Sequence, residues 1–384
     1  MSNRSLKLAA LCGATMLATL PALAEDYVVG FTAAQSGWLA SYDQPAYAGF
    51  KFCIDEINAK GGLAGKHKVV IDVRDTRSDT AETVKIAQEF VDKKVNFIIA
   101  PSDGDPTMAM GQITSPAGIP TLTPGGTAPI LTSVGEFVFG AYPADNQQAA
   151  VLGAYAAELG YKTAWLLKSP DAAYLLKGPE YFGQVFESKG GKVIGEGSFT
   201  LNQPDFSAIV TTVKALNPQP DVIMTSAWEP DFPAFIKALR GAGVTLPVMG
   251  ADVLDTPTVR GLGEVVNGIV HTSGGQTEEN PKQAEFNARY KAATGKEVDT
   301  NYIVNGCDVA GMIDAAVTAA GSTDPKAVRD ALANLKDAPG IMSNYTFAGT
   351  DRMPMRAVVL SKIDNGQKVF IRREMADPAT MPKP

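Results

Sequence analysis

Strand-like and helix-like segments alternate along most of this chain, and that alternation limits its possible folds more than any other feature. Short β-rich runs at 27–31 and 68–75 are separated by helical patterns over 41–62 and 79–94. The same order resumes after residue 146. Repeated strand–helix–strand units fold as parallel sheets that helices cover on both faces. The sequence therefore predicts a doubly wound α/β protein whose ligands bind beyond the carboxyl ends of the strands.

The alternating segments fall into two similar units, which predicts two lobes. Helical patterns and a final β-hairpin follow the second unit, so we expect the chain to cross between the lobes more than once. No low-complexity linker separates the units, so the crossings should be short hinges. We predict an N-terminal lobe from residues 25–143 and 274–346, and a C-terminal lobe from residues 144–273 and 347–384.

The first 24 residues have the features of a secretory signal peptide. Arg4 and Lys7 form a basic start, an apolar run covers 8–20, and Pro21 to Ala24 end in an Ala-x-Ala pattern. The apolar run is too short for a comfortable membrane span. We therefore expect cleavage after Ala24 and export to the periplasm. This leaves 360 of the 384 residues, a natural size for two lobes.

The charge and the cysteine content of the exported chain exclude several classes. The whole chain has a formal net charge of −7, and loss of Arg4 and Lys7 lowers it to −9. A negative net charge does not favour nucleic acid or an anionic membrane surface as partner. Only Cys53 and Cys307 remain, too few for a disulfide-dense scaffold. They either form one bridge or stay as two buried thiols.

The usual signatures of catalysis and of cofactor binding are missing from the sequence. The two histidines, His67 and His271, lie in a polar turn and at the end of a strand-like run, and they make no zinc site with the scattered cysteines. There is no Gly-x-Ser-x-Gly elbow, no P-loop spacing and no Gly-x-Gly-x-x-Gly after the first strand. The sequence therefore predicts binding without turnover, with no metal and no cofactor.

Several segments follow, in order, the pattern of a known family. The segment 49–75, GFKFCIDEINAKGGLAGKHKVVIDVRD, has a helix that ends in Ile-Asn-x-x-Gly-Gly and a strand that ends in Asp. Further matches lie at 118–132 (GIPTLTPGGTAPILT), 142–149 and 205–223. Over nearly the whole mature chain, the sequence resembles the leucine/isoleucine/valine-binding family, the periplasmic solute-binding receptors of ABC importers. The resemblance implies the type I periplasmic binding protein fold, in which two lobes joined by three crossovers close on a small ligand.

The resemblance also implies how the first lobe holds a ligand carboxylate, with main-chain N–H groups and hydroxyls at strand ends. The residues implied are Ser102, Asp103, Gly104, Gly125, Gly126 and Thr127. This chain departs from the family's Ser-Ser pair, because its segment reads SDGD. We expect Asp105 to cap a helix that begins near Pro106. Asp103 stays open: facing the ligand, it would repel a carboxylate and favour an amine or an amide N–H donor.

Other walls of the cleft follow from the same resemblance. The residues implied are Trp38, Tyr42, Tyr174, Trp228, Glu229 and Asp252. The family often places aromatic side chains over the ligand, although the surroundings of Tyr174 lack the family's Tyr-Gly-x-Gly. In amino-acid-binding relatives an acid at the position of Asp252 binds the α-ammonium group of the ligand.

These features predict an extracytoplasmic receptor that captures a small carboxylate-bearing solute, first of all a branched-chain amino acid, and delivers it to the membrane permease of an ABC importer. A small aromatic carboxylate and an amide- or urea-type solute stay open as alternative ligands. A ligand sensor for a membrane receptor and a secreted amidase-like enzyme are the other classes considered, and the histidine placement argues against the enzyme. We expect a monomer that closes around hinges near 142–146, 271–276 and 345–349.

Overall fold

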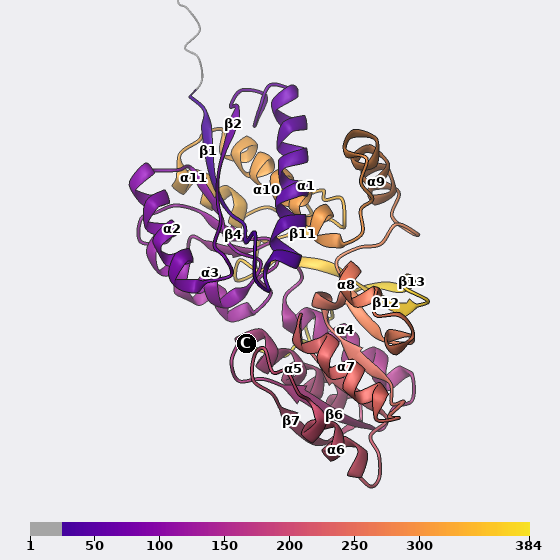
Figure 1. Cartoon of the computed structure of the whole chain (residues 1–384). Coiled ribbons are helices and arrows are strands. Elements are labelled where there is room, and N and C mark those ends of the chain that lie inside the picture. Colours follow the sequence, from indigo (N-terminus) through magenta and orange to yellow (C-terminus); the bar gives the residue numbers. More distant parts are fainter. Residues whose placement is uncertain (1–24) are drawn as a thin grey trace, which may run out of the picture.

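Two α/β lobes make up the part of the chain that the structure describes, residues 25–384 of a computed structural model (Figure 1). The expected signal peptide, residues 1–24, lies outside the described residues. The N-terminal lobe is built on a five-stranded parallel sheet with the order β2-β1-β3-β4-β5. Its strands are β1 (Tyr27–Thr32), β2 (Val69–Arg74), β3 (Phe97–Ile99), β4 (Thr121–Thr123) and β5 (Val138–Gly140).

Helices cover both faces of this sheet because side chains alternate along its strands. On β3, Phe97 and Ile99 belong to a core that α1 and α10 share, whereas Ile98 packs with residues of α2 and α3. Helices α9 and α11 add side chains to the first core. The helices of this lobe are α1 (Ala40–Ala59), α2 (Thr80–Lys93), α3 (Gly104–Thr114), η1 (Pro129–Val134), α9 (Pro281–Thr294), α10 (Asn301–Ala320) and α11 (Pro325–Ala333).

The backbones of α1 and α10 approach each other closely at two glycines. A Cβ atom on Gly306 would lie 2.0 Å from the carbonyl oxygen of Ala46, and one on Gly49 would lie 1.8 Å from that of Ile303. Only glycine fits at such a crossing. Among the described helices, α10 alone is long and apolar enough to cross a membrane, and the burial of 67% of its apolar window inside the lobe marks it as a core helix.

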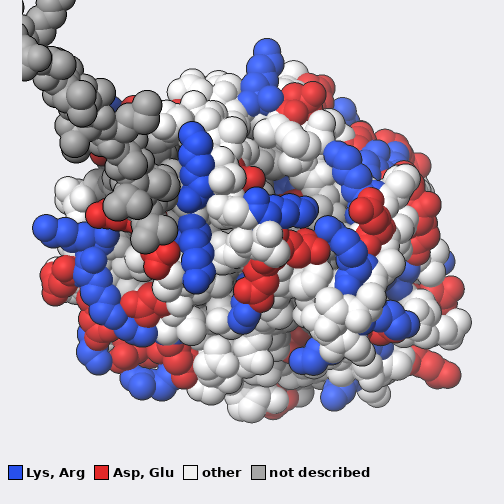
Figure 2. Space-filling model, turned by 90° about the horizontal axis from the view of Figure 1, so that it is seen from above, with Lys and Arg blue, Asp and Glu red and all other residues white. Residues whose placement is uncertain are grey.

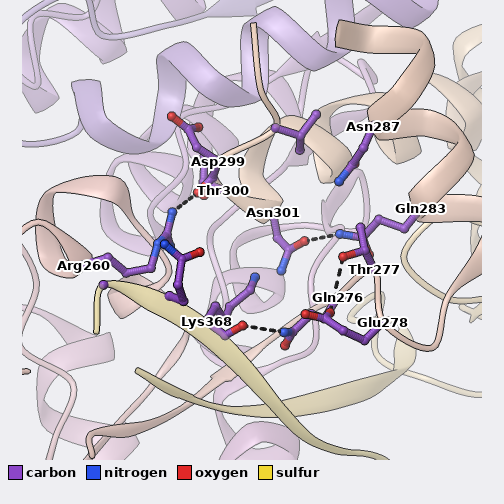
Figure 3. Close-up of a pocket in the computed structure, with 13 residues that line it drawn as sticks. Arg260, Gln276, Thr277, Glu278, Gln283, Asn287, Asp299, Thr300, Asn301 and Lys368 are labelled. Carbon is purple, nitrogen blue, oxygen red and sulfur yellow. Dashed lines mark hydrogen bonds between the residues drawn. The ribbon is translucent and has the colours of Figure 1, made fainter. Parts of the chain in front are cut away.

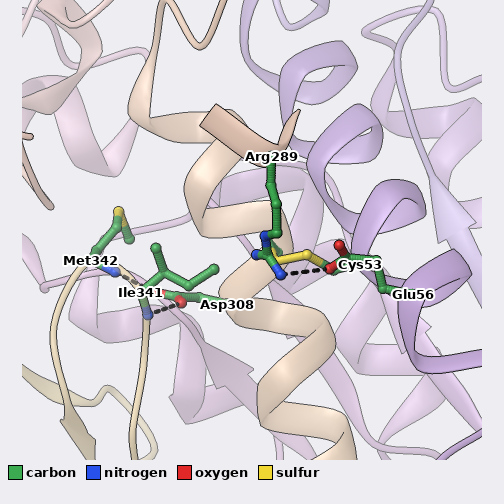
Figure 4. The surroundings of a disulfide bond; sticks show 7 residues. Cys53, Glu56, Arg289, Asp308, Ile341 and Met342 are labelled. Carbon is green, nitrogen blue, oxygen red and sulfur yellow. Dashed lines mark hydrogen bonds and ion pairs between the residues drawn. A yellow bond between two sulfur atoms is a disulfide. The ribbon is translucent and has the colours of Figure 1, made fainter. Parts of the chain in front are cut away.

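A disulfide bond joins the same two helices. Cys53 of α1 is bonded to Cys307 of α10, with their Cα atoms 5.2 Å apart. Figure 4 shows this bond beside the ion pair between Arg289 of α9 and Glu56, whose nitrogen and oxygen atoms are 3.1 Å apart. The sequence left the pairing of the two cysteines open, and the structure answers it with a bridge. Such a bond fits a protein of an oxidising compartment.

The C-terminal lobe is built on an eight-stranded mixed sheet. Its strands β7, β6, β8, β9 and β10 are parallel neighbours, whereas β12 runs antiparallel to β10 and pairs with β13 and with the short β11. The strands are β6 (Thr163–Lys168), β7 (Lys192–Ser198), β8 (Val222–Thr225), β9 (Val248–Gly250), β10 (Val270–Ser273), β11 (Tyr345–Thr346), β12 (Met355–Asp364) and β13 (Gln367–Met375).

The helices of this lobe also lie on both faces of their sheet. On β6, Ala164 and Leu166 share a core with α4 and α5, whereas Trp165 and Leu167 share one with α6 and α7. Short helical turns follow β9 and lead the chain to β10. The helices are α4 (Asp145–Glu158), α5 (Ala173–Ser188), α6 (Ser207–Ala215), α7 (Asp231–Gly241), η2 (Asp252–Leu254), α8 (Pro257–Arg260) and η3 (Gly263–Val266).

A buried arginine holds together the region where the chain passes between the lobes. The connecting segments are 141–144 after β5, 274–280 after β10 and 347–354 between β11 and β12. The short β11 pairs with β12, but its Tyr345 packs in the core of the N-terminal lobe, so the chain crosses after it. Arg356, at the start of β12, is fully buried. Its guanidinium donates to the carbonyl oxygens of Ala141 (2.9 Å) and Ser343 (3.1 Å) and pairs with Asp308 of α10. This one side chain therefore links the first and third connections to the N-terminal lobe.

The predicted fold class is confirmed: two α/β lobes with parallel sheets are joined by three connections. Helix α5 continues through Pro179, which lies in its second turn. Viewed from above, basic and acidic side chains are interspersed over the face that Figure 2 shows.

Candidate functional site

A small cavity lies between the lobes, at the carboxyl ends of β1, β3, β8 and β9 and at the first turns of α5 and α10. The side chains that line it are Trp38, Tyr42, Ser102, Asp103, Tyr174, Trp228, Val253 and Tyr302. Six of these residues were singled out from the sequence, and the structure brings them together here. Tyr302 and Val253 were not.

Aromatic rings form most of the wall of this cavity and meet across the two lobes. Trp38 of the N-terminal lobe stacks on Trp228 of the C-terminal lobe, with ring centroids 4.4 Å apart and an interplanar angle of 14°. Tyr174 continues the stack, with its centroid 5.9 Å from that of Trp228. The Tyr42 and Tyr302 rings meet edge to face at 5.3 Å. Such a wall suits the apolar part of a small ligand and can also hold a cation over a ring face.

The lobes are closed over this cavity. The cavity has a volume of about 10 Å³, enough for about one water molecule. Hydrogen bonds cross the cleft: Tyr302 Oη donates to Asp252 at 3.1 Å, and Ser41 Oγ donates to Glu229 at 3.1 Å. A ligand therefore enters only when the lobes separate, and it becomes enclosed when they close.

Glu229, which the sequence also singled out, supports this closure from beside the cavity. One carboxylate oxygen accepts from Ser41 of the other lobe, and the other accepts from the Thr256 hydroxyl at 2.5 Å. Both oxygens are thus occupied by protein hydroxyls, and Glu229 does not line the cavity. Its position shows that it joins the two lobes.

Tyr174 also lines a second cavity of about 10 Å³. The other walls of this cavity come from α4, α5 and the ends of β8, β9 and β10, and include Asp145, Gln148, Ser226 and Thr272. No lysine, arginine or histidine lines either cavity. The two cavities thus present carboxyls, hydroxyls and aromatic rings, without a cationic side chain.

Three buried carboxyls surround the two cavities. Asp252 accepts hydrogen bonds from the Tyr174 and Tyr302 hydroxyls, both at 3.1 Å, and burial raises its pKa to about 6. Burial also raises the pKa of Asp103 to about 7, and the neighbouring Asp105 adds to this shift. The pKa of Asp145 lies well above its usual value, again because of burial. In this environment each carboxylate benefits from a ligand that donates hydrogen bonds or carries positive charge.

Several buried polar atoms around the cleft have no hydrogen-bond partner in the described part of the protein. They are Ser102 Oγ, Thr127 Oγ1, Ser226 Oγ and both carboxylate oxygens of Asp145. The Ser102 hydroxyl still interacts with the carboxyl of Asp43, and the Thr127 hydroxyl with that of Asp145, without normal hydrogen-bond geometry. Each of these residues is less than a tenth exposed. Buried polar groups are nearly always paired in folded proteins, so a cluster of exceptions needs an explanation. A polar ligand in the closed cleft would supply partners for these atoms.

The glycine turn after β4 reaches the cleft mainly through Thr127. The Gly126 N–H donates to the Thr123 hydroxyl at 2.8 Å, and the Ser102 N–H donates to Asp43 at 2.8 Å, so both of these groups are engaged inside the lobe. Gly125 allows close packing, because a Cβ atom there would lie 2.8 Å from Ser102 Cβ. The Thr127 hydroxyl makes no hydrogen bond of normal geometry and lies near the carboxyl of Asp145, which lines the second cavity.

The helix after β3 begins earlier than predicted. Asp103 therefore precedes the helix, whereas Asp105 lies in its first turn. Helix α3 starts at Gly104, with Asp103 as its N-cap residue, so the expected cap at Asp105 was wrong. Pro106 did not mark the boundary, because proline is tolerated in the first turn of a helix. The Asp103 side chain makes no capping hydrogen bond and lines the cavity instead. The sequence left open whether Asp103 faces the cleft, and the structure shows that it lines the cavity there.

A larger cavity of about 350 Å³ lies elsewhere, beside the second connection between the lobes (Figure 3). The side chains around it are engaged with one another: Asp255 forms ion pairs with Arg260 (3.1 Å) and Lys368 (3.0 Å), and Asn301 donates to Asp255 at 2.8 Å. Gln283 donates to Asn301 at 2.8 Å. These contacts make a polar, internally paired region next to a hinge, without the aromatic wall of the smaller cleft.

The residues that sequence reasoning missed come from segments remote from the ones it used. Asp145 is the first residue of α4, and Tyr302 is the second residue of α10. Asp145 directly follows the first connection, and Tyr302 lies at the start of a helix whose Asn301 donates to the Gly275 carbonyl of the second connection. No local sequence pattern marks either residue as facing the cleft. Among the described residues, no group of three or more His, Cys, Asp or Glu side chains is arranged to hold a metal ion.

Comparison with known proteins places this two-lobed fold and its cleft in a family. A family model described as periplasmic binding protein matches residues 26–368. The Leu/Ile/Val-binding protein BraC3 of Rhizobium johnstonii is 24% identical over 363 residues, which cover 93% of this chain and 97% of that protein. The leucine-binding protein LivK from Thermotoga maritima superposes with a TM-score of 0.84 at 23% identity, covering 92% of this chain and 99% of that one.

An ABC-transporter solute-binding protein from R. palustris, solved in complex with 4-hydroxybenzoate, has a TM-score of 0.83 at 22% identity, covering 92% of this chain and 98% of that one. Both solved structures share the fold over 92% of the chain. Because the family model spans almost all of the described residues, the protein belongs to the periplasmic binding protein family.

Proposed function

We propose that this family member is the extracytoplasmic receptor of an ABC importer and captures a small amino acid by closure of its two lobes. The observation that carries the proposal is that side chains of both lobes meet in one aromatic and acidic cleft, as in the Trp38–Trp228 stack and the Tyr302–Asp252 hydrogen bond. A solute in this cleft contacts both lobes and so stabilises the closed arrangement. The membrane permease would then recognise the closed shape.

The ligand class rests on the groups that face the cleft. Asp252, oriented by two tyrosine hydroxyls, is the proposed acceptor for the ammonium group. The hydroxyls of Ser102 and Thr127, which make no hydrogen bond of normal geometry within the described residues, are the proposed partners of the opposite end of the ligand. The name of the relative BraC3, a Leu/Ile/Val-binding protein, supports an amino acid.

A small aromatic carboxylate is the second candidate ligand. The stack of Trp38, Trp228 and Tyr174 supports it, as does the structural neighbour that holds 4-hydroxybenzoate. The absence of lysine, arginine and histidine from the walls of both cavities favours the amino acid, since a benzoate brings only negative charge to a cleft with three carboxyls.

Location, partner and movement follow from the same proposal. The 1–24 segment would direct the chain to the periplasm, where the receptor acts as a monomer and delivers its solute to the permease. The connections at 141–144, 274–280 and 347–354 are the proposed hinges, close to the predicted ones. The boundaries of the two lobes proposed from the sequence, 143/144, 273/274 and 346/347, lie in or next to these connections.

Thermal unfolding of the mature chain in the presence of leucine, isoleucine, lysine, benzoate, 4-hydroxybenzoate and acetamide tests the proposal. A ligand at 100 times its Kd stabilises the folded state by about 2.7 kcal/mol and raises Tm. Asp252→Asn should weaken amino-acid binding about tenfold or more, because it removes a charged hydrogen-bond acceptor. Asp92→Asn, an exposed change on α2, is the control. The amino-acid proposal fails if Asp252→Asn binds amino acids normally, and the receptor proposal fails if no small solute raises Tm.

A further inference from the structure

The two cavities of the cleft have more buried carboxyl groups around them than the single ammonium group of a neutral amino acid could pair with. Asp103, Asp145 and Asp252 are 7%, 3% and 1% exposed, and they come from α3, α4 and η2. The chain supplies no compensating charge, because no cationic side chain lines either cavity. Asp252 is bonded by the neutral hydroxyls of Tyr174 and Tyr302. The ammonium group of one amino acid would satisfy only one of the three acids.

Asp145 is the acid that most clearly needs a partner. Neither of its carboxylate oxygens makes a hydrogen bond of normal geometry among the described residues, although the nearby Thr127 hydroxyl partly offsets the rise in pKa that burial causes. The hydroxyl of Ser226 also has no hydrogen-bond partner there. Asp145 and Ser226 line the same cavity, and Ser226 is fully buried. Asp43, another buried acid nearby, differs in this respect, because it accepts from the N–H groups of Ala34 (2.9 Å) and Ser102 (2.8 Å). A buried carboxylate with no donor is costly, so the site around Asp145 is suited to a bound donor.

We infer that the solute is a small organic cation with a net positive charge, with one nitrogen at Asp252 and a second ammonium or guanidinium group between Asp145 and Asp103. This inference rests on the proposed receptor function and names the substrate class within it: a diamine or a basic amino acid, not a neutral branched-chain one. Two cationic groups would balance most of the charge of the three acids. The rings of Trp38, Tyr174 and Trp228 add faces that attract a cation.

The ionisation of these acids predicts how the affinity for a cation depends on pH. Burial raises the pKa of Asp103 to about 7 and that of Asp252 to about 6, so both carboxyls lose protons between about pH 5.5 and 8. The titratable groups that interact with Asp145 and Asp103 are Asp252, Asp43, Asp105, Tyr174 and Tyr181, none of which is cationic. A cation binds the ionised acids, so its affinity should rise with pH. A neutral amide held by protonated acids would bind more weakly as pH rises.

The experiment is isothermal titration of the mature chain, freed of bound solute by unfolding and refolding, with putrescine, lysine, leucine, benzoate and the uncharged amide acetamide. Putrescine or lysine should bind at least tenfold more tightly than leucine at pH 8, and at least fivefold more tightly at pH 8 than at pH 5.5. Asp145→Asn should weaken the cation at least tenfold without weakening leucine. Asp92→Asn, on the surface of α2, should change neither. Circular dichroism and Tm show whether each variant folds, and Ser226→Ala, with an expected loss of about threefold, replaces Asp145→Asn if that variant does not.

The outcomes separate the two proposals. If leucine or benzoate binds and neither cation does, or if Asp145→Asn and Ser226→Ala leave cation affinity unchanged, the cation inference is wrong while the receptor function stands. If an uncharged amide binds and weakens as pH rises, the inference is also wrong. If none of these solutes binds to the folded chain, the amino-acid receptor proposal fails with it.

Discussion

At the scale of single residues, burial of Asp103 links the stability of the protein to pH. Its pKa is about 7 in the folded chain and about 3.8 without the fold. Between these values the folded state binds more protons than the unfolded state, so the free energy of unfolding falls as pH rises from about 4 to about 7. Below pH 4 the carboxyl is protonated in both states and contributes no further change. His271, whose pKa burial lowers to about 4, has the opposite slope.

Replacement of Asp103 by asparagine isolates this effect. In the solute-free protein, Asp103→Asn should raise the free energy of unfolding by about 1–3 kcal/mol at pH 7.5 relative to wild type, and change it little at pH 4.5. Urea unfolding at the two pH values measures the difference, and comparison with wild type at each pH cancels the contribution of His271. An equal effect at both pH values would show that Asp103 is not held in its raised-pKa environment.

The same scale shows how far the candidate site could be predicted from the sequence. Trp38, Trp228 and Asp252 were predicted from the family resemblance, and the structure places all three near the cleft because each follows a strand and the ends of parallel strands share one edge of a sheet. Tyr302 and Asp145 were missed because they reach the cleft from helices that begin near the connections, and no local pattern shows which helix start faces the other lobe. The direction of the Asp103 side chain depended on where α3 begins, which is a matter of one or two residues.

At the scale of elements, the pair α1 and α10 carries the strictest packing requirement of the N-terminal lobe. Gly306→Ala should lower the free energy of unfolding by about 1–3 kcal/mol or more, because its Cβ would lie 2.0 Å from the Ala46 carbonyl oxygen and would push the helices apart. Gly311→Ala is the matched control on the same helix: nothing lies within 4 Å of its Cβ, so it should gain about 1 kcal/mol of helix propensity. Denaturant unfolding under non-reducing conditions keeps the Cys53–Cys307 bond intact. Similar effects of the two changes would contradict the close crossing.

The bounds of helices and strands were the part of the fold that the sequence predicted best. The expected strand at 27–31 and helix at 79–94 agree with β1 and α2 to within one residue at each end, because periodicity and end residues are local properties of the chain. The pairing of Cys53 with Cys307 could not be predicted, since the two residues are 254 positions apart and meet only when α1 and α10 cross. The antiparallel place of the β12–β13 hairpin beside β10 likewise depends on the path of the third connection.

At the scale of the whole molecule, the closed arrangement is stabilised by contacts that the solute does not make. The Ser41 hydroxyl crosses the cleft to Glu229, and Trp38 crosses to Trp228, while Arg356 holds the region of the connections. The Ser41–Glu229 and Trp38–Trp228 contacts join the two lobes and exist only in the closed state, so they affect how long a bound solute stays enclosed. Those of Arg356 should persist when the lobes open, because the pivot region moves least.

Ser41→Ala therefore should shorten the lifetime of the bound state without touching the solute. The change removes one hydrogen bond to a charged acceptor between the lobes, so the dissociation rate of the solute should rise about 2- to 10-fold while the association rate stays nearly constant. Stopped-flow measurement of tryptophan fluorescence can follow both rates, because Trp38 and Trp228 stack only across the closed cleft. Ser188→Ala, whose hydroxyl bonds within its own helix to Val185, is the control and should leave both rates unchanged. A Ser41→Ala variant with a normal dissociation rate would mean that closure draws its free energy from the solute and the aromatic stack alone.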